Sequence, residues 1–230
     1  MTAVLVVACS IVGLVVGWML DPVITRVPLK QPVFGPPPAD EAPPSNARRI
    51  LVTIITGALF GATAARFDDS WLLPAYLVFT GALVALAVID FETYLLPNKI
   101  VYPLTVAMLV LLAFGTAVEG DLGDYGRGLV AGVIAFVIFF VLHLVSPRSM
   151  GFGDVKLSFT LGLALGVLGW GDMVLGLFLG FLYGAVIGLI LIATKVRGKS
   201  QAVPFGPFLA AGAITAVLVA APILDWYRGT

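Results

Sequence analysis

Two aspartates at the edges of apolar stretches are the residues of this chain best placed to do chemistry. Asp90 ends the apolar run 85–89, and Asp154 stands just ahead of another apolar run, at the end of a G-x-G-D string at 151–154. An ionisable side chain at mid-bilayer costs about 2.5–3.5 kcal/mol on insertion scales, so an acid beside such a run needs a reason. Most of the other acids lie among polar neighbours, where exposure to water explains them.

Two carboxyl groups held close together away from water do not ionise together, because each charge disfavours the other. One group keeps its proton and the pair titrates as a unit. Such a pair is suited to peptide hydrolysis. The ionised carboxylate takes a proton from water, the water attacks the scissile carbonyl, and the protonated partner polarises the carbonyl oxygen. This chemistry requires no metal. The lone histidine, His143, lies in an apolar run, where a packing role is expected.

The residues around each aspartate predict how it is presented. Gly151 and Gly153 can adopt backbone conformations closed to other residues and would let an extended peptide approach Asp154. Pro97 cannot continue the helix that carries Asp90 and should fix a turn into the next helix. Each motif alone also fits an ordinary structural role, as a turn or as a connection at the membrane interface.

Glu92 is a second acid close to Asp90. On a continuing helix the two side chains point about 200° apart, so we expect only one of them to face a site.

The composition predicts the class of protein that must position these residues. Of 230 residues, 60% are hydrophobic and 11% charged, and the mean hydropathy is +1.08. These values exclude a water-soluble enzyme, a disordered chain and a nucleic-acid binder built on a basic face. Runs long enough to cross a bilayer predict an all-α, polytopic membrane protein with about eight transmembrane helices. The runs are Ala3–Leu20, Ile50–Ala65, Trp71–Ile89, Val101–Val118, Gly128–Val145, Leu157–Leu168, Met173–Thr194 and Pro204–Ile223.

The distribution of basic residues predicts the orientation. With the N-terminus outside, ten lysines and arginines fall in inner loops and three in outer segments. By the positive-inside rule this places Asp90 and Asp154 together at the cytoplasmic face. They can share a site if the third and sixth helices are neighbours. Residues 21–49 form the longest polar stretch, and their prolines predict a cytoplasmic loop with little regular structure.

Glycines recur at every fourth position through Gly176, Gly180, Gly184 and Gly188, and Gly162 and Gly166 lie on the preceding helix. Small residues at this spacing let helix backbones approach closely in lipid. We therefore predict tight helix packing along this ridge and assign it no chemistry.

Taken together, the motifs resemble those of the bacterial type IV prepilin leader peptidases, which are membrane aspartyl proteases of the G-x-G-D class. The first matching pair is Asp90 ahead of a Leu-Pro turn ending at Pro97, with the G-x-G-D string at 151–154. Residues 17–28 and 203–213 are similar to two further stretches of that family. The resemblance runs in order along nearly the whole chain, so we expect 1–230 to form a single integral membrane peptidase domain.

The resemblance implies an aspartic-type endopeptidase that removes the short basic leader from prepilins or pseudopilins, just ahead of their hydrophobic helix. Asp90 and Asp154 would be the catalytic dyad, with Gly151, Gly153, Lys156 and Pro97 in support. Lys156 would either bias the dyad electrostatically or mark the inner face. The enzyme would sit in the bacterial cytoplasmic membrane with its active site facing the cytoplasm. Its partners would be the pilin substrate and the lipid bilayer, with no nucleic acid, and the resemblance leaves the oligomeric state open.

One departure from the family concerns a second activity. Many members carry two C-x-x-C pairs in the first cytoplasmic loop, where a zinc site accompanies N-methylation by S-adenosylmethionine. This chain has one cysteine, Cys9, so a thiolate zinc site is excluded. Asp21-Pro22 also replaces the asparagine and small aliphatic residue usual in the family. We expect no cofactor for the peptidase and S-adenosylmethionine only if methylation is retained.

Rival readings remain. A proton-coupled transporter would also place aspartates near glycine-rich helices, but it should show inverted repeats and acids at mid-bilayer, which the sequence lacks. A structural scaffold in a pilus or secretion machine would make both aspartates dispensable. A protease that cuts other transmembrane substrates would share the G-x-G-D string.

Overall fold

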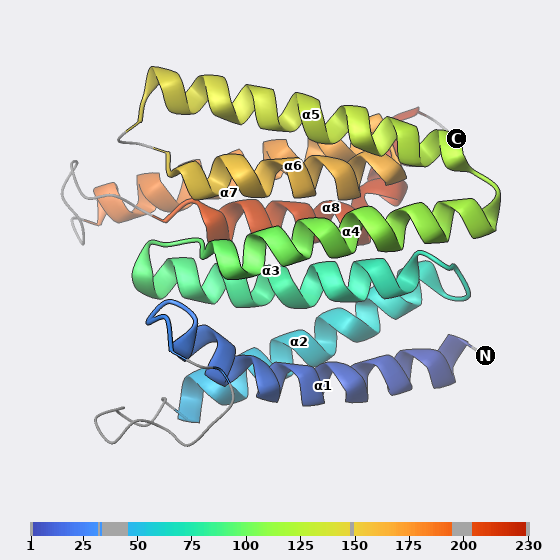
Figure 1. Cartoon of the computed structure of the whole chain (residues 1–230), viewed down its shortest axis with the longest axis horizontal. Coiled ribbons are helices and arrows are strands. Elements are labelled where there is room, and N and C mark those ends of the chain that lie inside the picture. The colour runs from blue at the N-terminus through green and yellow to red at the C-terminus, as the bar shows by residue number, and fades with distance from the viewer. Residues whose placement is uncertain (1, 32, 34–45, 148–149, 195–203, 229–230) are drawn as a thin grey trace.

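The computed structural model folds the chain into a bundle of helices packed side by side (Figure 1). It describes residues 2–31, 33, 46–147, 150–194 and 204–228. In these residues every regular element is an α-helix, and there are eight, as predicted. They are α1 Thr2–Arg26, α2 Asn46–Phe67, α3 Leu73–Thr93, α4 Asn98–Glu119, α5 Leu122–Val145, α6 Phe152–Leu168, α7 Trp170–Ala193 and α8 Gly206–Arg228.

The helices have the length and surface of membrane spans. Six of them, α1 to α5 and α7, are long and apolar enough to cross a bilayer, and the described part of α8 contributes a shorter apolar helix. The outer faces of the bundle carry large exposed hydrophobic side chains such as Val7, Val106, Val137 and Val174. These faces suit lipid rather than water. The chain is a multi-pass membrane protein.

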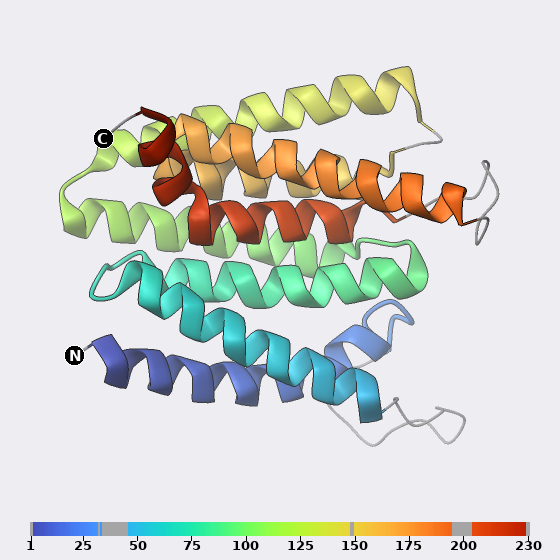
Figure 2. The same cartoon turned by 180° about the vertical axis from the view of Figure 1, so that it is seen from behind.

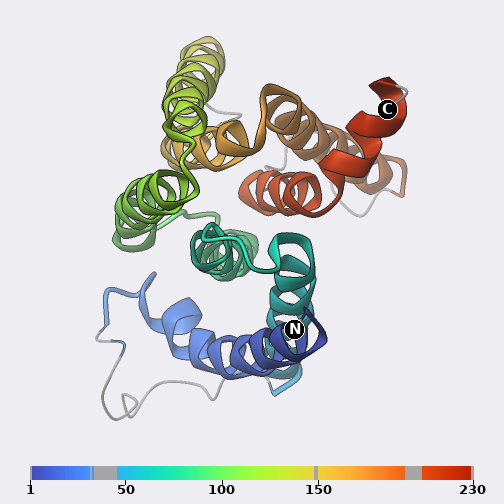
Figure 3. The ribbon, with the colours of Figure 1, turned by 90° about the vertical axis from the view of Figure 1, so that its right-hand side faces the viewer.

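Successive helices alternate in direction, so both chain termini lie at the same end of the bundle (Figure 1). Seen end-on, α3 lies in the middle, between the α1–α2 pair on one side and α8 on the other (Figure 3). The pairs α5–α6 and α7–α8 pack tightly along their lengths, and the rear view shows α7 and α8 running side by side (Figure 2).

The core is built around α3, whose side chains Phe79, Leu83 and Leu86 are fully or almost fully buried. The sequence left it open whether the third and sixth helices are neighbours, and the structure does not pack them directly: α4 and α8 each contact both helices, and one long side chain reaches from α3 to α6. The hydroxyl of Tyr76 on α3 donates a hydrogen bond to the carbonyl of Ala164 on α6 at 2.6 Å. Both partners lie inside the bundle, where an unpaired polar group would be costly.

Glycines set the closest helix contacts, as the sequence predicted. A Cβ added at Gly162 of α6 would lie 2.6 Å from the Ala131 carbonyl oxygen of α5. On α7, a Cβ added at Gly176 would lie 3.0 Å from Ala216 Cβ of α8, and one added at Gly180 would lie 3.0 Å from Leu209 Cδ2. The prediction is wrong for Gly188, where an added Cβ would meet no atom of the described residues within 4 Å. The ridge therefore packs along its first part only.

The predicted loop at 21–49 is shorter than expected at both ends. α1 continues through Pro22 to Arg26, and α2 already begins at Asn46. The sequence prediction ended the first helix before Asp21 because a charged side chain marks the end of an apolar run. In the structure the helix continues, and the Asp21 side chain is buried on α1. The proline runs at 34–38 and 43–44 lie outside the described residues. α6 also starts earlier than predicted, at Phe152, since its first turn contains charged residues.

The glycine contacts yield a stability prediction. Replacing Gly162 with alanine should lower stability by about 1–3 kcal/mol, because the added methyl group collides with the backbone of α5. Gly188→Ala is the matched control and should leave stability unchanged or slightly raised, since alanine favours the helix. Thermal unfolding in detergent compares the two variants, and equal melting temperatures would contradict the packing role of Gly162.

Candidate active site

A cavity of about 350 Å³ opens at the end of the bundle opposite the two termini. Three connections between helices converge there: α3 to α4, α5 to α6, and α7 to α8. Its lining consists of Asp90, Tyr94, Leu95, Leu96, Asn98, Pro147, Met150, Gly151, Phe152, Gly153, Asp154, Lys156, Pro204 and Phe205. All six site residues predicted from the sequence lie in or beside this cavity, since Pro97 falls between Leu96 and Asn98.

Asp90 lies in the last turn of α3 and is 6% exposed. The backbone N–H of Gly206 donates a hydrogen bond to its Oδ2 at 2.9 Å. Gly206 is the first residue of α8, and a helix N-terminus favours negative charge because its amide groups point outward. A Cβ at Gly206 would lie 2.7 Å from the same oxygen, so a side chain there would displace the carboxylate.

Asp154 lies in the first turn of α6 and is 5% exposed. Its backbone N–H bonds to the carbonyl of Gly151 at 3.1 Å. Its Oδ1 is buried and has no hydrogen-bond partner among the described residues. The charge of Asp90 acts on this carboxyl group, so the two acids share one electrostatic environment. Each carboxyl group thus interacts with the backbone of one glycine, Gly206 for Asp90 and Gly151 for Asp154, and the two differ in the buried Oδ1 of Asp154, which has no donor among the described residues.

Gly153 brings the two motifs into contact. A Cβ at this position would lie 2.8 Å from the Cβ of Leu96, in the Leu-Pro turn that follows Asp90. The prediction that the glycines adopt conformations closed to other residues is wrong. Gly151 has φ −67° and ψ 144°, and Gly153 is helical. Gly153 is needed for space between α6 and the turn, and its backbone geometry is ordinary.

The connection between α3 and α4 takes the form predicted from Pro97. α3 ends at Thr93, and Tyr94 adopts φ 56°, with its N–H bonded to the carbonyl of Asp90. Pro97, with φ −69°, then directly precedes the first residue of α4. A non-glycine residue with positive φ is uncommon, and here it closes the helix in the left-handed conformation that often caps helix ends. The turn fixes where the last turn of α3 stops.

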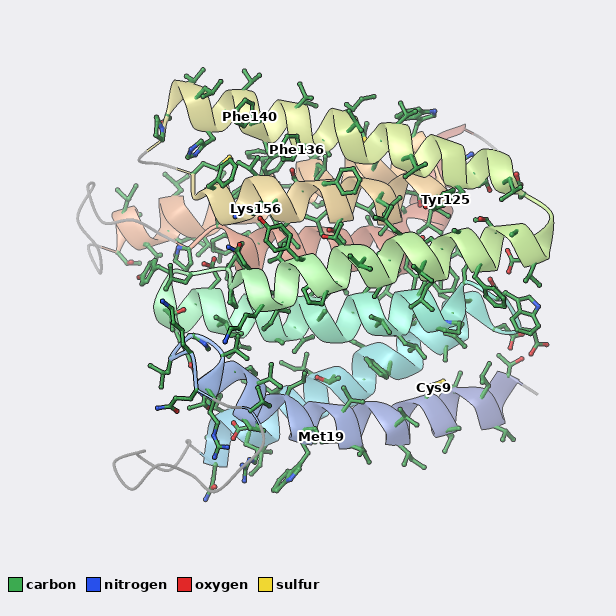
Figure 4. The ribbon with its side chains drawn as sticks, viewed as in Figure 1. Cys9, Met19, Tyr125, Phe136, Phe140 and Lys156 are labelled. Atoms are coloured by element: carbon green, nitrogen blue, oxygen red, sulfur yellow. The ribbon has the colours of Figure 1, made fainter. Side chains whose placement is uncertain are left out.

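Lys156 and His143 both have structural partners. The Lys156 ammonium donates to Asn98 Oδ1 at 3.0 Å and lies near the rings of Tyr102 and Phe152. Lys156 thus joins the start of α6 to the start of α4, and Figure 4 shows it on the cavity side of the bundle. The Nδ1 of His143 is 2.8 Å from the carbonyl oxygen of Met150, a polar contact of the kind expected for this histidine.

Glu92 lies outside the cavity lining, as its angular position on the helix predicted. Sequence reasoning missed Gly206 and Leu96. The stretch containing Gly206 was recognised as a motif, but its contact with Asp90 spans 116 positions and no local pattern indicates it. In the described part of the chain, no group of three histidine, cysteine or acidic side chains is arranged to hold a metal ion.

Comparison with known proteins gives a consistent set of relatives. A family model described as the type IV leader peptidase family matches residues 77–194. The chain is 35% identical over 186 residues to the prepilin leader peptidase/N-methyltransferase of Aeromonas hydrophila, covering 80% of this chain and 62% of that protein. The Bacillus subtilis protein of the same name is 31% identical over 174 residues, covering 76% of this chain and 67% of the relative.

The Stutzerimonas stutzeri protein, again of that name, is 35% identical over 175 residues, covering 75% of this chain and 59% of its own length. The chain thus spans about three-fifths of the length of the Aeromonas relative it matches. No solved structure shows significant similarity to it. Both aspartates fall inside the matched segment, and on this evidence the chain belongs to the type IV leader peptidase family.

Proposed function

We propose that the chain is a membrane aspartyl endopeptidase that removes the leader peptide of type IV prepilins or pseudopilins. One observation carries the proposal: Asp90 and Asp154, 64 positions apart in sequence, line the same cavity with each side chain almost wholly buried. The relatives' names, prepilin leader peptidase/N-methyltransferase, supply the substrate class. An acid pair at the end of a membrane bundle supplies the chemistry.

The asymmetry of the pair assigns a role to each acid. Asp90 accepts the Gly206 amide hydrogen at the N-terminus of α8, which favours its ionised form. The carboxyl group of Asp154 interacts with the backbone of Gly151, but its buried Oδ1 has no donor among the described residues, and this burial favours the protonated form. Asp90 then acts as the base that takes a proton from the attacking water. Asp154 donates a hydrogen bond to the scissile carbonyl oxygen and later gives its proton to the leaving amine.

The place of the cavity fits such a substrate. It lies where the helices end, so an amide bond just ahead of a hydrophobic helix can reach the acids while that helix remains in lipid. The loops at this end are those predicted to be cytoplasmic from their lysines and arginines. We therefore place the protein in the bacterial cytoplasmic membrane, with the cavity facing the cytoplasm. A proton-coupled transporter is disfavoured because its acids would lie near the bilayer centre.

We expect the cleavage activity to depend on both acids. Asp90→Asn and Asp154→Asn should each lower kcat for a prepilin peptide by about 10²–10⁴-fold, because each removes one half of the acid–base pair. Cleavage by the purified protein in detergent, without added metal, measures the effect. Asp172→Asn is the matched control: Asp172 is also a buried acid but lies in the first turn of α7, away from the cavity. Near-normal turnover in either cavity variant would refute the assignment.

The contact of Gly206 with Asp90 gives a second test. Gly206→Ala should lower kcat by about 10²-fold while the fold is kept, because the methyl group pushes the Asp90 carboxylate from its place. Gly188→Ala, in open space on α7, should cleave like the parent chain. If Gly206→Ala retains full activity, the amide of Gly206 does not orient the dyad.

N-methylation is the second candidate activity, since the relatives' names include it. The residues described here do not fit the family's zinc-associated route. The single cysteine, Cys9, is buried on α1, and the described residues contain no group of three histidine, cysteine or acidic side chains that could hold a metal ion. We derive no step through this cofactor.

We expect the cleaved pilin to remain unmethylated in the presence of S-adenosylmethionine. Incubating purified protein with a prepilin peptide and the cofactor, and then weighing the new N-terminal product by mass spectrometry, tests this. A product one methyl group heavier would show that a thiolate zinc site is dispensable for methylation.

A further inference from the structure

A buried acid on α1 holds together the part of the bundle farthest from α6. Asp21 is 2% exposed, and its two oxygens pair with different arginines of α2. Arg48 Nη2 lies 2.8 Å from Oδ1, and Arg49 Nη2 lies 3.0 Å from Oδ2. Arg49 also lies over the ring of Trp18, 4.5 Å from its centroid. A buried carboxylate needs such pairing because its desolvation is costly.

Arg48 reaches beyond α1 and α2 to α3. Its Nη1 donates to both carboxylate oxygens of Glu92, at 3.1 and 2.9 Å, while Nη2 also donates to Thr25 Oγ1 at 2.7 Å. The planar guanidinium group offers its donors in a fixed fork, so it sets the distance between its two acid partners. The Asp21–Arg48–Glu92 chain therefore joins three helices.

Glu92 belongs to the same helical turn as Asp90, and this turn is the last of α3. The two side chains project in nearly opposite directions, so the turn is held on both sides. Gly206 of α8 binds Asp90 on one side, and Arg48 of α2 binds Glu92 on the other. Terminal turns lack part of their backbone hydrogen bonding and open easily unless other groups hold them.

We propose that Arg48 is a positioning residue for the dyad, acting through Glu92 to fix the helical turn that carries Asp90. This inference rests on the proposed function only for its catalytic readout. Glu92 is 38% exposed, and an ion pair of this kind adds little to global stability. Its removal should affect where the turn sits far more than whether the bundle folds.

Steady-state cleavage of a prepilin peptide by the full chain in detergent tests the proposal. Glu92→Ala and Arg48→Met should each lower kcat by about 10-fold with little change in KM, because they displace a catalytic carboxylate and leave the peptide-binding surface in place. The double variant should be no slower than either single variant, since both break the same link. Additive losses would overturn the proposal, as would an unchanged kcat in Glu92→Ala.

Arg49→Met is the matched control. It removes the other ion pair to Asp21, so it should lower the melting temperature about as much as Arg48→Met, yet it leaves Glu92 held and kcat unchanged. An equal loss of kcat in Arg49→Met would assign Arg48 a purely structural role in the α1–α2 pair.

A second readout does not depend on catalysis. Amide hydrogen exchange at residues 91–94 should become faster in Glu92→Ala and Arg48→Met but remain at the parent rate in Arg49→Met. Unchanged exchange in the first two variants would overturn the inference even if the peptidase is confirmed. If the parent chain cleaves no prepilin, the proposed function fails, and the exchange measurement alone decides the role of Arg48.

Discussion

The burial of two carboxyl groups at one end of an apolar bundle is the constraint on which the rest of this structure depends. A buried charge is tolerated only with partners, and a pair of neighbouring acids is tolerated only if they do not both ionise. The start of α8 supplies an amide donor to Asp90, and the backbone of Gly151 interacts with the carboxyl group of Asp154, whose buried Oδ1 has no donor among the described residues. In the proposed mechanism, the same contacts that permit burial also favour the ionised form of Asp90 and the protonated form of Asp154.

The contacts around the two aspartates require helix backbones to approach closely, and a glycine allows this approach at Gly153 and at Gly206. Gly153 lets α6 meet the turn at Leu96, and Gly206 lets α8 meet Asp90. In lipid, burial from water does not drive helices together, so small residues and specific hydrogen bonds must set their distances. Hence the glycine of G-x-G-D that lies next to the aspartate is explained by packing, without an unusual backbone conformation.

The sequence was informative where a pattern is local. The apolar runs predicted eight helices, the break at Pro97 predicted the end of α3, and the angle between Asp90 and Glu92 predicted which acid faces the cavity. It was misleading for Asp21, because the partners that permit its burial, Arg48 and Arg49, come 27 and 28 positions later. Contacts of this kind depend on the three-dimensional path of the chain, which hydropathy does not encode.

Polar interactions differ between the middle of the bundle and its cavity end. Inside the bundle, buried hydroxyl groups such as those of Thr56 and Thr116 donate to carbonyls of their own helices, whereas Thr80 Oγ1 has no partner among the described residues. At the cavity end, charged chains cross between helices, from Asp21 through Arg48 to Glu92. Ionised groups are least costly where water can reach the membrane edge. A peptidase that cuts just ahead of a hydrophobic helix needs its acids at the membrane edge, because the amide bond of such a substrate lies there. The membrane edge is also where ionised side chains cost least, so both requirements place the acids at the same end of the bundle.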